Sequence, residues 1–137
     1  MSQENVDIVR QIHAGNRSDR AADSLDEIIS LFHPDCEFVS AMGAVDQQTY
    51  RGHDGLRRYR RDLEAAWTEW QIEIEEIFEP SPGTVVSIIR PHLVARESGI
   101  ALDDRRVTVT EFADGQIIRV SAHASRAEAL EAIGLPE

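Results

Sequence analysis

The feature that most constrains the fold is a change in hydrophobic periodicity near residue 70. Before it, apolar residues recur at spacings of three, four or seven, which indicates amphipathic helices. From Gln71 onward the period is two, as in the segment QIEIEEIFE, and this is typical of half-buried strands. The turn signals PSPG, ESG and Ala113-Asp-Gly115 divide the second half into four antiparallel strands. Helices grouped ahead of such a meander predict an α+β fold and not a parallel sheet.

Four helices are expected. The first covers residues 3–14, and the second begins at the capping box Ser24-Leu-Asp-Glu27, includes Phe32 and ends before Pro34. The third follows Asp54 and carries its apolar residues on one face, namely Leu56, Tyr59, Leu63, Ala66, Trp67 and Trp70. A second capping box, Ser125-Arg-Ala-Glu128, opens the last helix.

The strands complete the predicted architecture. A short strand is expected at residues 36–42, with a loop over residues 43–49, and the third strand of the meander is expected at residues 100–112. Pro91 lies in the middle of the second meander strand, which indicates a bulge or a sheet edge. We therefore predict one domain, residues 1–137, with a curved, mostly antiparallel sheet wrapped around a long helix and a cavity at its open end.

Composition excludes several function classes. The net charge of −11 repels phosphate backbones and anionic membranes, so neither nucleic acid nor a membrane is an expected partner. There is no signal-peptide pattern and no apolar run near the roughly 20 residues of a membrane helix, so we expect a cytoplasmic protein. Cys36 is the single cysteine, and no CxxC or HxxxH spacing is present, so no disulfide, metal or cofactor is expected.

Five segments resemble one family: SQENVDIVRQIHAGN, LFHPDCEFVS, TYRGHDGLRRYRRDL, TVVSIIR and DGQIIRVSAHASRAEALEAIGL. They are similar to the SnoaL-like branch of the nuclear-transport-factor-two-like superfamily, across nearly the whole chain. The resemblance implies a cone-shaped α+β fold with one pocket for a small, largely apolar organic molecule, and a homodimer formed through the open sheet face. The superfamily includes polyketide cyclases, ketosteroid isomerases, dehydratases, epoxide hydrolases and members without known activity, so the fold alone does not choose a function.

Several functional positions of the family carry other residues here. The slot of the isomerase base corresponds to Ser40, and a hydroxyl does not abstract a carbon-bound proton without an activating base. The slot of the cyclase acid falls within Ser121-Ala-His123-Ala-Ser125, where no carboxylate is present. Thr108 and Thr110 occupy slots that often hold histidine and tryptophan. A partial dehydratase-like set remains, consisting of His92, His123, Tyr50, Tyr59 and Glu111.

Four residues are candidates for catalysis. Arg90 and His92 share a strand face and together suit a carbonyl or carboxylate group, unless that face meets solvent or a dimer partner. Glu111 alternates with Val107 and Val109, so it points inward if they do, and burial would raise its pKa. His123 faces outward if the apolar residues on the other side of its strand pack on the helices.

The aromatic residues are candidates for the pocket wall. Tyr59, Trp67 and Trp70 are expected on one helix face, partly in the core and partly around the cavity, with Tyr50 nearby. Together with Ser40 and Thr108 they form the predicted ligand pocket, while His13 is interpreted as a structural residue on the apolar stripe of the first helix.

Two functions remain open at this point. The first is a cofactor-independent cyclase, isomerase or dehydratase that acts by general acid–base chemistry on a hydrophobic cyclic or polyketide-like substrate, with His92, Arg90, Glu111 and His123 at the polar end of the pocket. The second is a non-catalytic ligand-binding or dimerisation module of the same fold. A convergent ionisable cluster in the cavity favours the enzyme, and an apolar cavity favours the binding module.

Overall fold

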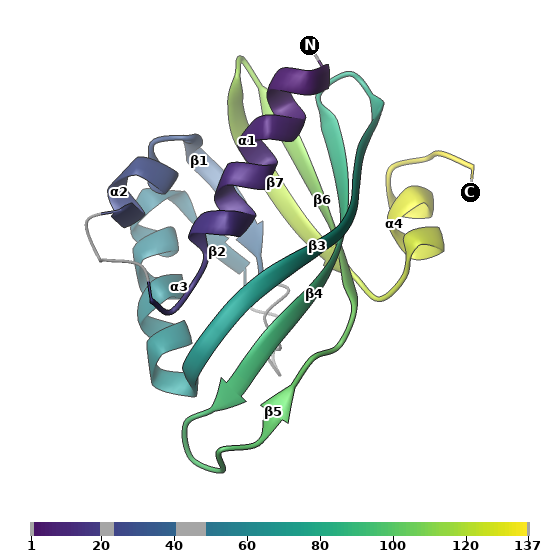
Figure 1. The fold of residues 1–137 in the computed structure, drawn as a ribbon. Helices are drawn as coiled ribbons and strands as arrows, with labels where there is room; N and C mark the ends of the chain where they lie inside the picture. Colours follow the sequence, from purple (N-terminus) through teal and green to yellow (C-terminus); the bar gives the residue numbers. More distant parts are fainter. Residues whose placement is uncertain (1, 20–23, 41–48, 137) are drawn as a thin grey trace.

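The computed structural model describes residues 2–19, 24–40 and 49–136, which form four helices and a seven-stranded sheet (Figure 1). The helices are α1 (Ser2–Gly15), α2 (Ser24–Ile29), α3 (Gly52–Ala66) and α4 (Arg126–Ala132). The strands are β1 (Phe32–Val39), β2 (Thr49–Arg51), β3 (Trp67–Ser81), β4 (Thr84–Ala95), β5 (Ala101–Leu102), β6 (Arg106–Ala113) and β7 (Gln116–His123). None of these helices is long and apolar enough to span a lipid bilayer.

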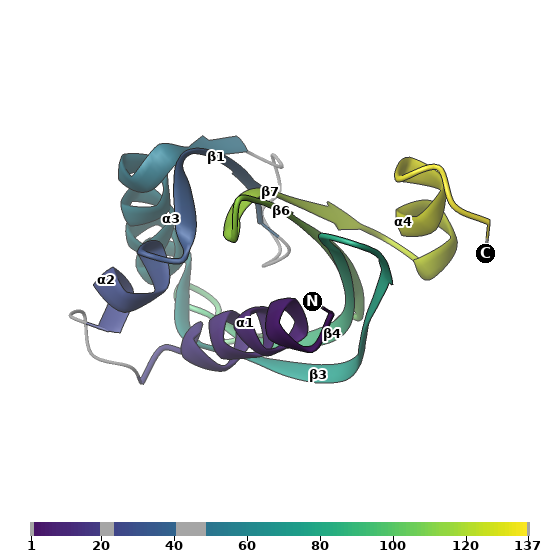
Figure 2. The ribbon, with the colours of Figure 1, turned by 90° about the horizontal axis from the view of Figure 1, so that it is seen from above.

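The sheet confirms the predicted fold class. Its strand order is β2-β1-β7-β6-β4-β3, with β5 added beside β4, and of the pairings in the described residues β1 with β7 is parallel and the rest are antiparallel. Viewed from above, the sheet curves around α1, with α3 beside β1 and α4 outside the curve (Figure 2). The fold is therefore an open, curved α+β cone whose concave side faces α1 and α3.

Alternation along β4 and β6 divides the sheet into two faces. Val86 of β4 and both Val107 and Val109 of β6 are fully buried against Ala129 and Leu130 of α4. Residues of opposite parity on the same two strands therefore point to the concave side. The convex face is thus partly covered by α4, and the concave face is left to form a cavity with the other helices.

The boundary between α3 and β3 differs from the prediction. The helix ends at Ala66, and Trp67 and Trp70 belong to β3, where they pair with Ala95 and Leu93 of β4. Pairing to β4 satisfies the backbone of these residues along the sheet, so the strand begins earlier than the alternation alone indicates. The placement of both tryptophans on a helix face was wrong.

Arg96 closes the end of α3. Its backbone N–H donates to the carbonyl of Ala66 at 3.0 Å, and its Nε and Nη2 donate to the carbonyls of Glu64 and Trp67 at 2.9 and 3.2 Å. Helix C-termini leave carbonyls without intrahelical partners, and a guanidinium satisfies them well.

The segment between α2 and β1 also differs from the prediction. The helix begins at Ser24 as expected but ends at Ile29, so Phe32 is the first residue of β1 and not part of the helix. Pro34 lies inside β1, in the stretch between Phe32 and Glu37 where the pairing with β7 shifts register. The expected strand at residues 36–42 therefore starts earlier; residues 41 and 42 and loop residues 43–48 lie outside the described residues.

Pro91 lies at an interruption in the pairing of β4. On one side β6 pairs with β4 only as far as Ile89, and β5 resumes the pairing at Leu93. Proline has no N–H to donate, so a position between two partner strands suits it. For the same reason the single strand predicted over residues 100–112 is divided into β5 and β6.

The predicted turn and cap near the C-terminus are confirmed. Asp114 and Gly115 have φ of 53° and 81°, as a tight hairpin between β6 and β7 requires. Ser125 accepts a hydrogen bond from the backbone N–H of Glu128 at 3.2 Å, and Glu128 Oε2 accepts one from the N–H of Ala124 at 3.1 Å. The first bond is the N-cap half of the predicted capping box, while the Glu128 carboxylate accepts from the residue before the cap and not from Ser125 itself.

Gly52, at the start of α3, gives a test of this packing. It has φ of +66°, and a Cβ there would lie 2.9 Å from the carbonyl oxygen of Pro34, whereas Gly99 has φ of +70° with no atom within 4 Å of its Cβ position. Both Gly→Ala changes cost about 1 kcal/mol of backbone strain, but only Gly52→Ala must also displace the backbone of β1. We expect a larger loss of unfolding free energy in urea for Gly52→Ala, and equal losses in the two variants would contradict this packing.

Candidate functional site

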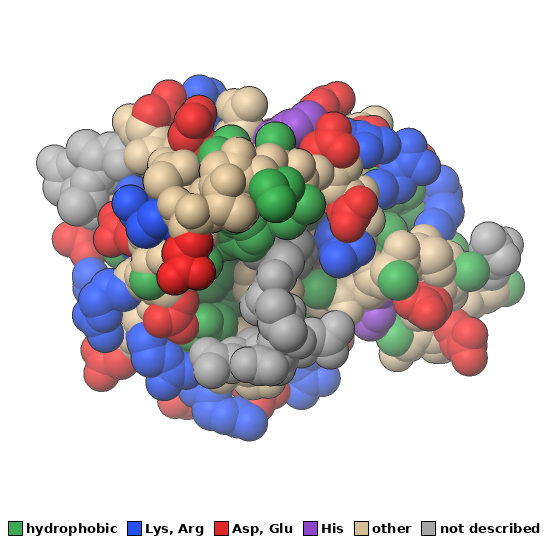
Figure 3. Space-filling model, turned by 90° about the horizontal axis from the view of Figure 1, so that it is seen from below, with side chains coloured by type: hydrophobic (Ala, Val, Ile, Leu, Met, Phe, Trp, Pro, Cys, Tyr) green, Lys and Arg blue, Asp and Glu red, His purple; other side chains and the backbone are tan. Residues whose placement is uncertain are grey.

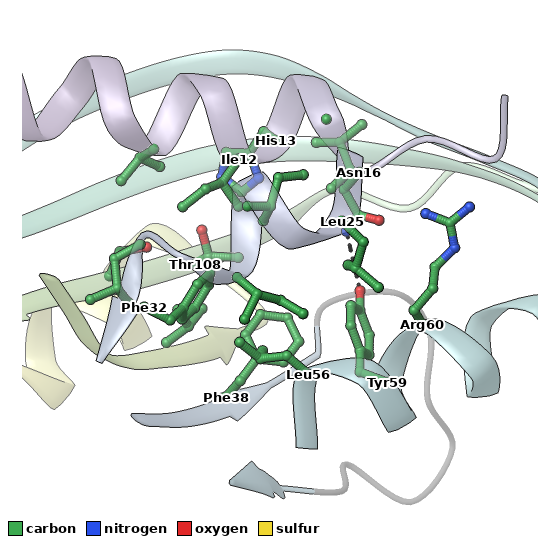
Figure 4. Close-up of a pocket in the computed structure, with 18 of the residues that line it drawn as sticks. Ile12, His13, Asn16, Leu25, Phe32, Phe38, Leu56, Tyr59, Arg60 and Thr108 are labelled. Atoms are coloured by element: carbon green, nitrogen blue, oxygen red, sulfur yellow. Dashed lines mark hydrogen bonds between the residues drawn. The ribbon is translucent and has the colours of Figure 1, made fainter. Parts of the chain in front are cut away.

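A cavity of about 80 Å³ lies between the concave face of the sheet and helices α1, α2 and α3 (Figure 4). Apolar side chains from all of these elements form most of its wall: Val9, Ile12, Leu25, Ile28, Ile29, Phe32, Phe38, Val39, Leu56, Leu63, Ile72, Ile89, Ile117 and Val120. Seen from below, hydrophobic side chains are visible in a hollow between charged ones (Figure 3). The cavity is therefore suited to an organic molecule with a large apolar surface.

A few polar residues complete the wall. They are His13 and Asn16 at the end of α1 and just beyond it, Tyr59 and Arg60 of α3, and Thr108 and Thr110 of β6. None of the described residues that line the cavity is an aspartate or glutamate.

Tyr59 and Asn16 belong to a hydrogen-bond chain at one side of the cavity. The indole Nε1 of Trp70 donates to Asn16 Oδ1 at 3.1 Å, and Asn16 Nδ2 donates to the hydroxyl oxygen of Tyr59 at 3.2 Å. Tyr59 also bonds the side chain of Ser40, and burial raises the pKa of Tyr59 above its ordinary value. These polar groups hold one another in place, and Tyr59 is a neutral phenol at physiological pH.

Arg60 is the one charged residue among the cavity-lining side chains that the structure describes. Its guanidinium lies 5.0 Å from the centre of the Trp70 ring, and its Nε donates to Glu64 Oε2 at 3.2 Å. Its side chain is only 14% exposed. The charge of Arg60 is thus balanced by a neighbouring carboxylate and an aromatic face.

His13 points from α1 into the cavity (Figure 4). It is 7% exposed, and its Nε2 is buried without a hydrogen-bond partner in the described part of the chain. Burial lowers the pKa of His13 from 6.5 to about 4, because removal from water disfavours the charged imidazolium. His13 is therefore a neutral imidazole above pH 6, with one ring nitrogen available to the cavity.

Thr108 presents a second free polar group from the opposite wall. It is 3% exposed, and its Oγ1 also has no hydrogen-bond partner among the described residues. Ser87 of β4 is paired with Thr108 of β6 and is fully buried. Its Oγ also has no hydrogen-bond partner among the described residues. The large majority of buried side-chain polar atoms have a hydrogen-bond partner, so two without one in a cavity wall and a third beside them require an explanation.

Arg90 and His92 lie on the convex face of β4, outside the cavity lining. Arg90 donates from Nε to Glu75 Oε2 at 3.2 Å and from Nη1 to the carbonyl of Asp103 at 2.7 Å, while His92 Nε2 lies 3.0 Å from Glu73 Oε1. His92 does meet a carboxylate, but on the face opposite the cavity, since Ile89 and not Arg90 points inward. The structure does not place this pair at the polar end of the pocket.

Glu111 and His123 are also absent from the cavity lining as described. Glu111 shares a face with Val107 and Val109, and these pack on α4, so the condition for an inward carboxylate is not met. Its Oε2 lies 4.0 Å from Arg119 Nη1. His123 Nε2 lies 2.9 Å from the Ser121 hydroxyl, on the side of β7 opposite Val120. The four predicted catalytic residues therefore do not converge in the cavity.

Of the six residues predicted for the ligand pocket, Tyr59 and Thr108 line the cavity. Ser40 is buried and does not line the cavity itself; its side chain is hydrogen-bonded to Tyr59, which does. Tyr50, Trp67 and Trp70 instead pack behind it in a cluster with Leu63 and Leu93, where the Tyr50 hydroxyl donates to Asp62 Oδ2 at 2.6 Å. Burial, and then that bond, raise the pKa of Tyr50 to about 12.

Sequence reasoning missed His13 and Asn16 as cavity residues. His13 was interpreted as a structural residue on the apolar stripe of the first helix. A histidine on that stripe was the signal available in the sequence, because the stripe faces the concave side of the sheet. Asn16 lies beyond the helix and carried no comparable signal.

No group of three or more His, Cys, Asp or Glu side chains that could hold a metal is found in the described residues.

Comparison with known proteins identifies relatives across most of the chain. A family model described as a SnoaL-like domain matches residues 7–120. An NTF2-like protein of unknown function from Burkholderia pseudomallei K96243 is 20% identical over 96% of this chain and 98% of its own, with a TM-score of 0.74. TerC co-crystallised with polyporic acid is 20% identical over 95% and 98%, with a TM-score of 0.73. A putative SnoaL-like polyketide cyclase from Jannaschia sp. CCS1 is 19% identical over 99% and 95%, with a TM-score of 0.70. No curated protein sequence matches the chain.

The lowered pKa of His13 predicts a specific dependence of stability on pH. Between pH 6.5 and about 4 the unfolded chain protonates His13 and the folded chain does not, so the free energy of unfolding falls as the pH is lowered. The contribution is on the order of 3 kcal/mol over this range. We expect His13→Gln to lose this part of the slope in urea unfolding at several pH values, and slopes identical to the wild type would contradict a neutral, buried His13.

Proposed function

The chain belongs to the SnoaL-like domain family, and we propose that it binds a small, largely apolar organic molecule in the cavity between α1, α3 and the concave face of the sheet. The observation that carries the proposal is the wall itself, which is apolar apart from a few polar groups at defined positions. Burial of an apolar ligand there is favourable by roughly 25 cal/mol for each Å² removed from water.

The size of the cavity limits the ligand. An engineered apolar cavity of about 150 Å³ binds benzene, whereas this one has a volume of about 80 Å³. We therefore propose a ligand with a single ring at the buried end, whose entry displaces partly buried side chains such as Ile12, Leu25 and Ile28. A structural relative was co-crystallised with polyporic acid, which is consistent with an organic ligand for this fold.

A second candidate function is a cofactor-independent cyclase, isomerase or dehydratase that acts on a hydrophobic cyclic or polyketide-like substrate. The neutral imidazole of His13, with a free Nε2 at the cavity, favours it. A pKa of about 4 makes this imidazole a weak base, and the described lining holds no carboxylate to share the proton. Binding without turnover is therefore the better supported function, and mass analysis of a bound compound after incubation distinguishes the two.

A homodimer is part of the proposal. Beyond the region covered by α4, the convex face of β3 and β4 presents His92 and Glu73, and near it Ile100 and Leu102 of the described chain are 59% and 44% exposed. Large apolar side chains with this exposure suit a contact between two copies.

A filled cavity tests the ligand-binding function. Toluene and phenol should raise the melting temperature of the wild type; Ile12→Trp adds bulk where Ile12 points into the cavity (Figure 4), so we expect it to abolish this rise. Leu102→Trp adds the same side chain on the exposed strand β5 and should keep the rise.

The variant His92→Ala completes this test. It should bind as the wild type does, because His92 lies on the convex face and pairs with Glu73. If Ile12→Trp is folded by circular dichroism and still binds, the cavity is not the site. If His92→Ala loses binding, the site lies on the convex face.

The mass in solution tests the dimer. Light scattering coupled to gel filtration should give twice 15.4 kDa for the wild type. Charge introduced by Ile100→Glu together with Leu102→Glu should shift the mass to that of one chain, because both side chains are exposed on the proposed contact. A wild-type mass of one chain would refute the dimer.

A further inference from the structure

Two buried polar atoms belong to residues that line the cavity, and a third lies beside one of them, on the strand residue paired with Thr108. His13 Nε2, Thr108 Oγ1 and Ser87 Oγ lack a hydrogen-bond partner within the described residues, and their side chains are 7%, 3% and 0% exposed. A buried polar group without a partner has lost its hydrogen bonds to water and gained none in return, which destabilises the folded protein. Such groups in a natural protein indicate that a hydrogen-bonding group outside the described residues pairs with them.

Geometry places two of the three side by side. Thr108 and Ser87 are directly paired between the antiparallel strands β6 and β4, so their Cβ atoms are about 5 Å apart. Both lie on the concave face, because Thr108 lines the cavity and Ser87 is two residues before the cavity residue Ile89. His13 enters from α1 on the opposite wall (Figure 4).

The chemistry of these groups is neutral and mixed. Each hydroxyl offers one donor and two acceptor positions, and a neutral imidazole offers one donor and one acceptor. A ligand hydroxyl both donates and accepts hydrogen bonds, so it can pair with the hydroxyls of Thr108 and Ser87 or with the imidazole of His13. A carbonyl oxygen only accepts, so it can pair only with their donor groups. A carboxylate or an ammonium would be buried without a counter-charge here, because His13 is neutral and Arg60 is paired with Glu64.

We propose that Thr108, Ser87 and His13 form a subsite that recognises the hydroxyl group of an uncharged, ring-bearing ligand. The inference rests on the proposed binding function and adds the ligand class to it: a phenol or a cyclic alcohol, with the ring against the apolar wall and the hydroxyl between β6 and α1. Specificity then comes from the polar groups, since the apolar wall accepts any ring of suitable size.

The matched substitutions Thr108→Val and Thr110→Val test the subsite. Both threonines are 3% exposed and line the cavity, and valine has nearly the same shape, but Thr110 is not among the side chains with an unpartnered buried atom. Titration calorimetry with phenol, toluene and benzoate measures the preference for the hydroxyl as the ratio of the Kd values for toluene and phenol.

We expect Thr108→Val to lower this ratio about tenfold and Thr110→Val to leave it within twofold. Ser87→Ala should lower it by a smaller factor, and benzoate should bind more weakly than phenol to every variant. Urea unfolding of each variant confirms that it is folded before titration.

Two outcomes would overturn the inference while leaving the proposed function intact. One is that phenol and toluene bind the wild type and Thr108→Val with the same ratio, and the other is that benzoate binds most tightly. If toluene, phenol and benzoate all fail to bind the wild type, and single-ring compounds fail to stabilise it, the proposed function itself is wrong.

Discussion

The alternation of side chains along β4 and β6 decides which chemistry reaches the cavity. On one face Val86, Val107 and Val109 pack against α4, and on the other Ile89 and Thr108 border the cavity. A slip of one residue in either strand would exchange these two sets, because successive side chains point to opposite faces. The Asp114-Gly115 hairpin fixes the register of β6 against β7, and burial of three valines under α4 makes any other register costly. The identity of the cavity wall therefore follows from contacts made on the other side of the sheet.

This dependence explains what the sequence could predict. The period of two showed that Arg90 and His92 share a face and that Glu111 shares one with Val107 and Val109, and the structure agrees on both points. Which face is concave depends on where α1 and α4 pack, and these helices are distant in sequence from β4. The α+β class, the cone and the Ser125 cap were predictable because they depend on local signals and on resemblance across the whole chain. Which side-chain face of a strand points into the cavity was not predictable from the sequence.

The helix boundaries show a second limit of the same kind. Trp67 and Trp70 are spaced from Leu63 as residues of one helix face would be, yet their backbones pair with β4. Phe32 likewise fits the stripe of α2 but begins β1 beside Ile117. In both places the side chains pack against the core as helix residues on the same stripe would, so hydrophobic spacing does not distinguish the two conformations. Strand pairing and the cap by Arg96 decide between them, and both are contacts between residues that are distant in the sequence, the nearest being Trp70 and Leu93.

The polar groups of the cavity differ in what they contribute to stability. Asn16, Tyr59 and Trp70 satisfy one another, so their burial costs little and they keep the α1 end of the cavity in place. Thr108, Ser87 and His13 have no such compensation in the described chain, and apolar residues of the same shape would fill their positions without the desolvation cost. Side chains that lower the stability of the free protein are characteristic of sites where a ligand supplies the missing contact. The cost of leaving these atoms unpaired is thus the reason to expect selectivity from a cavity that is otherwise apolar.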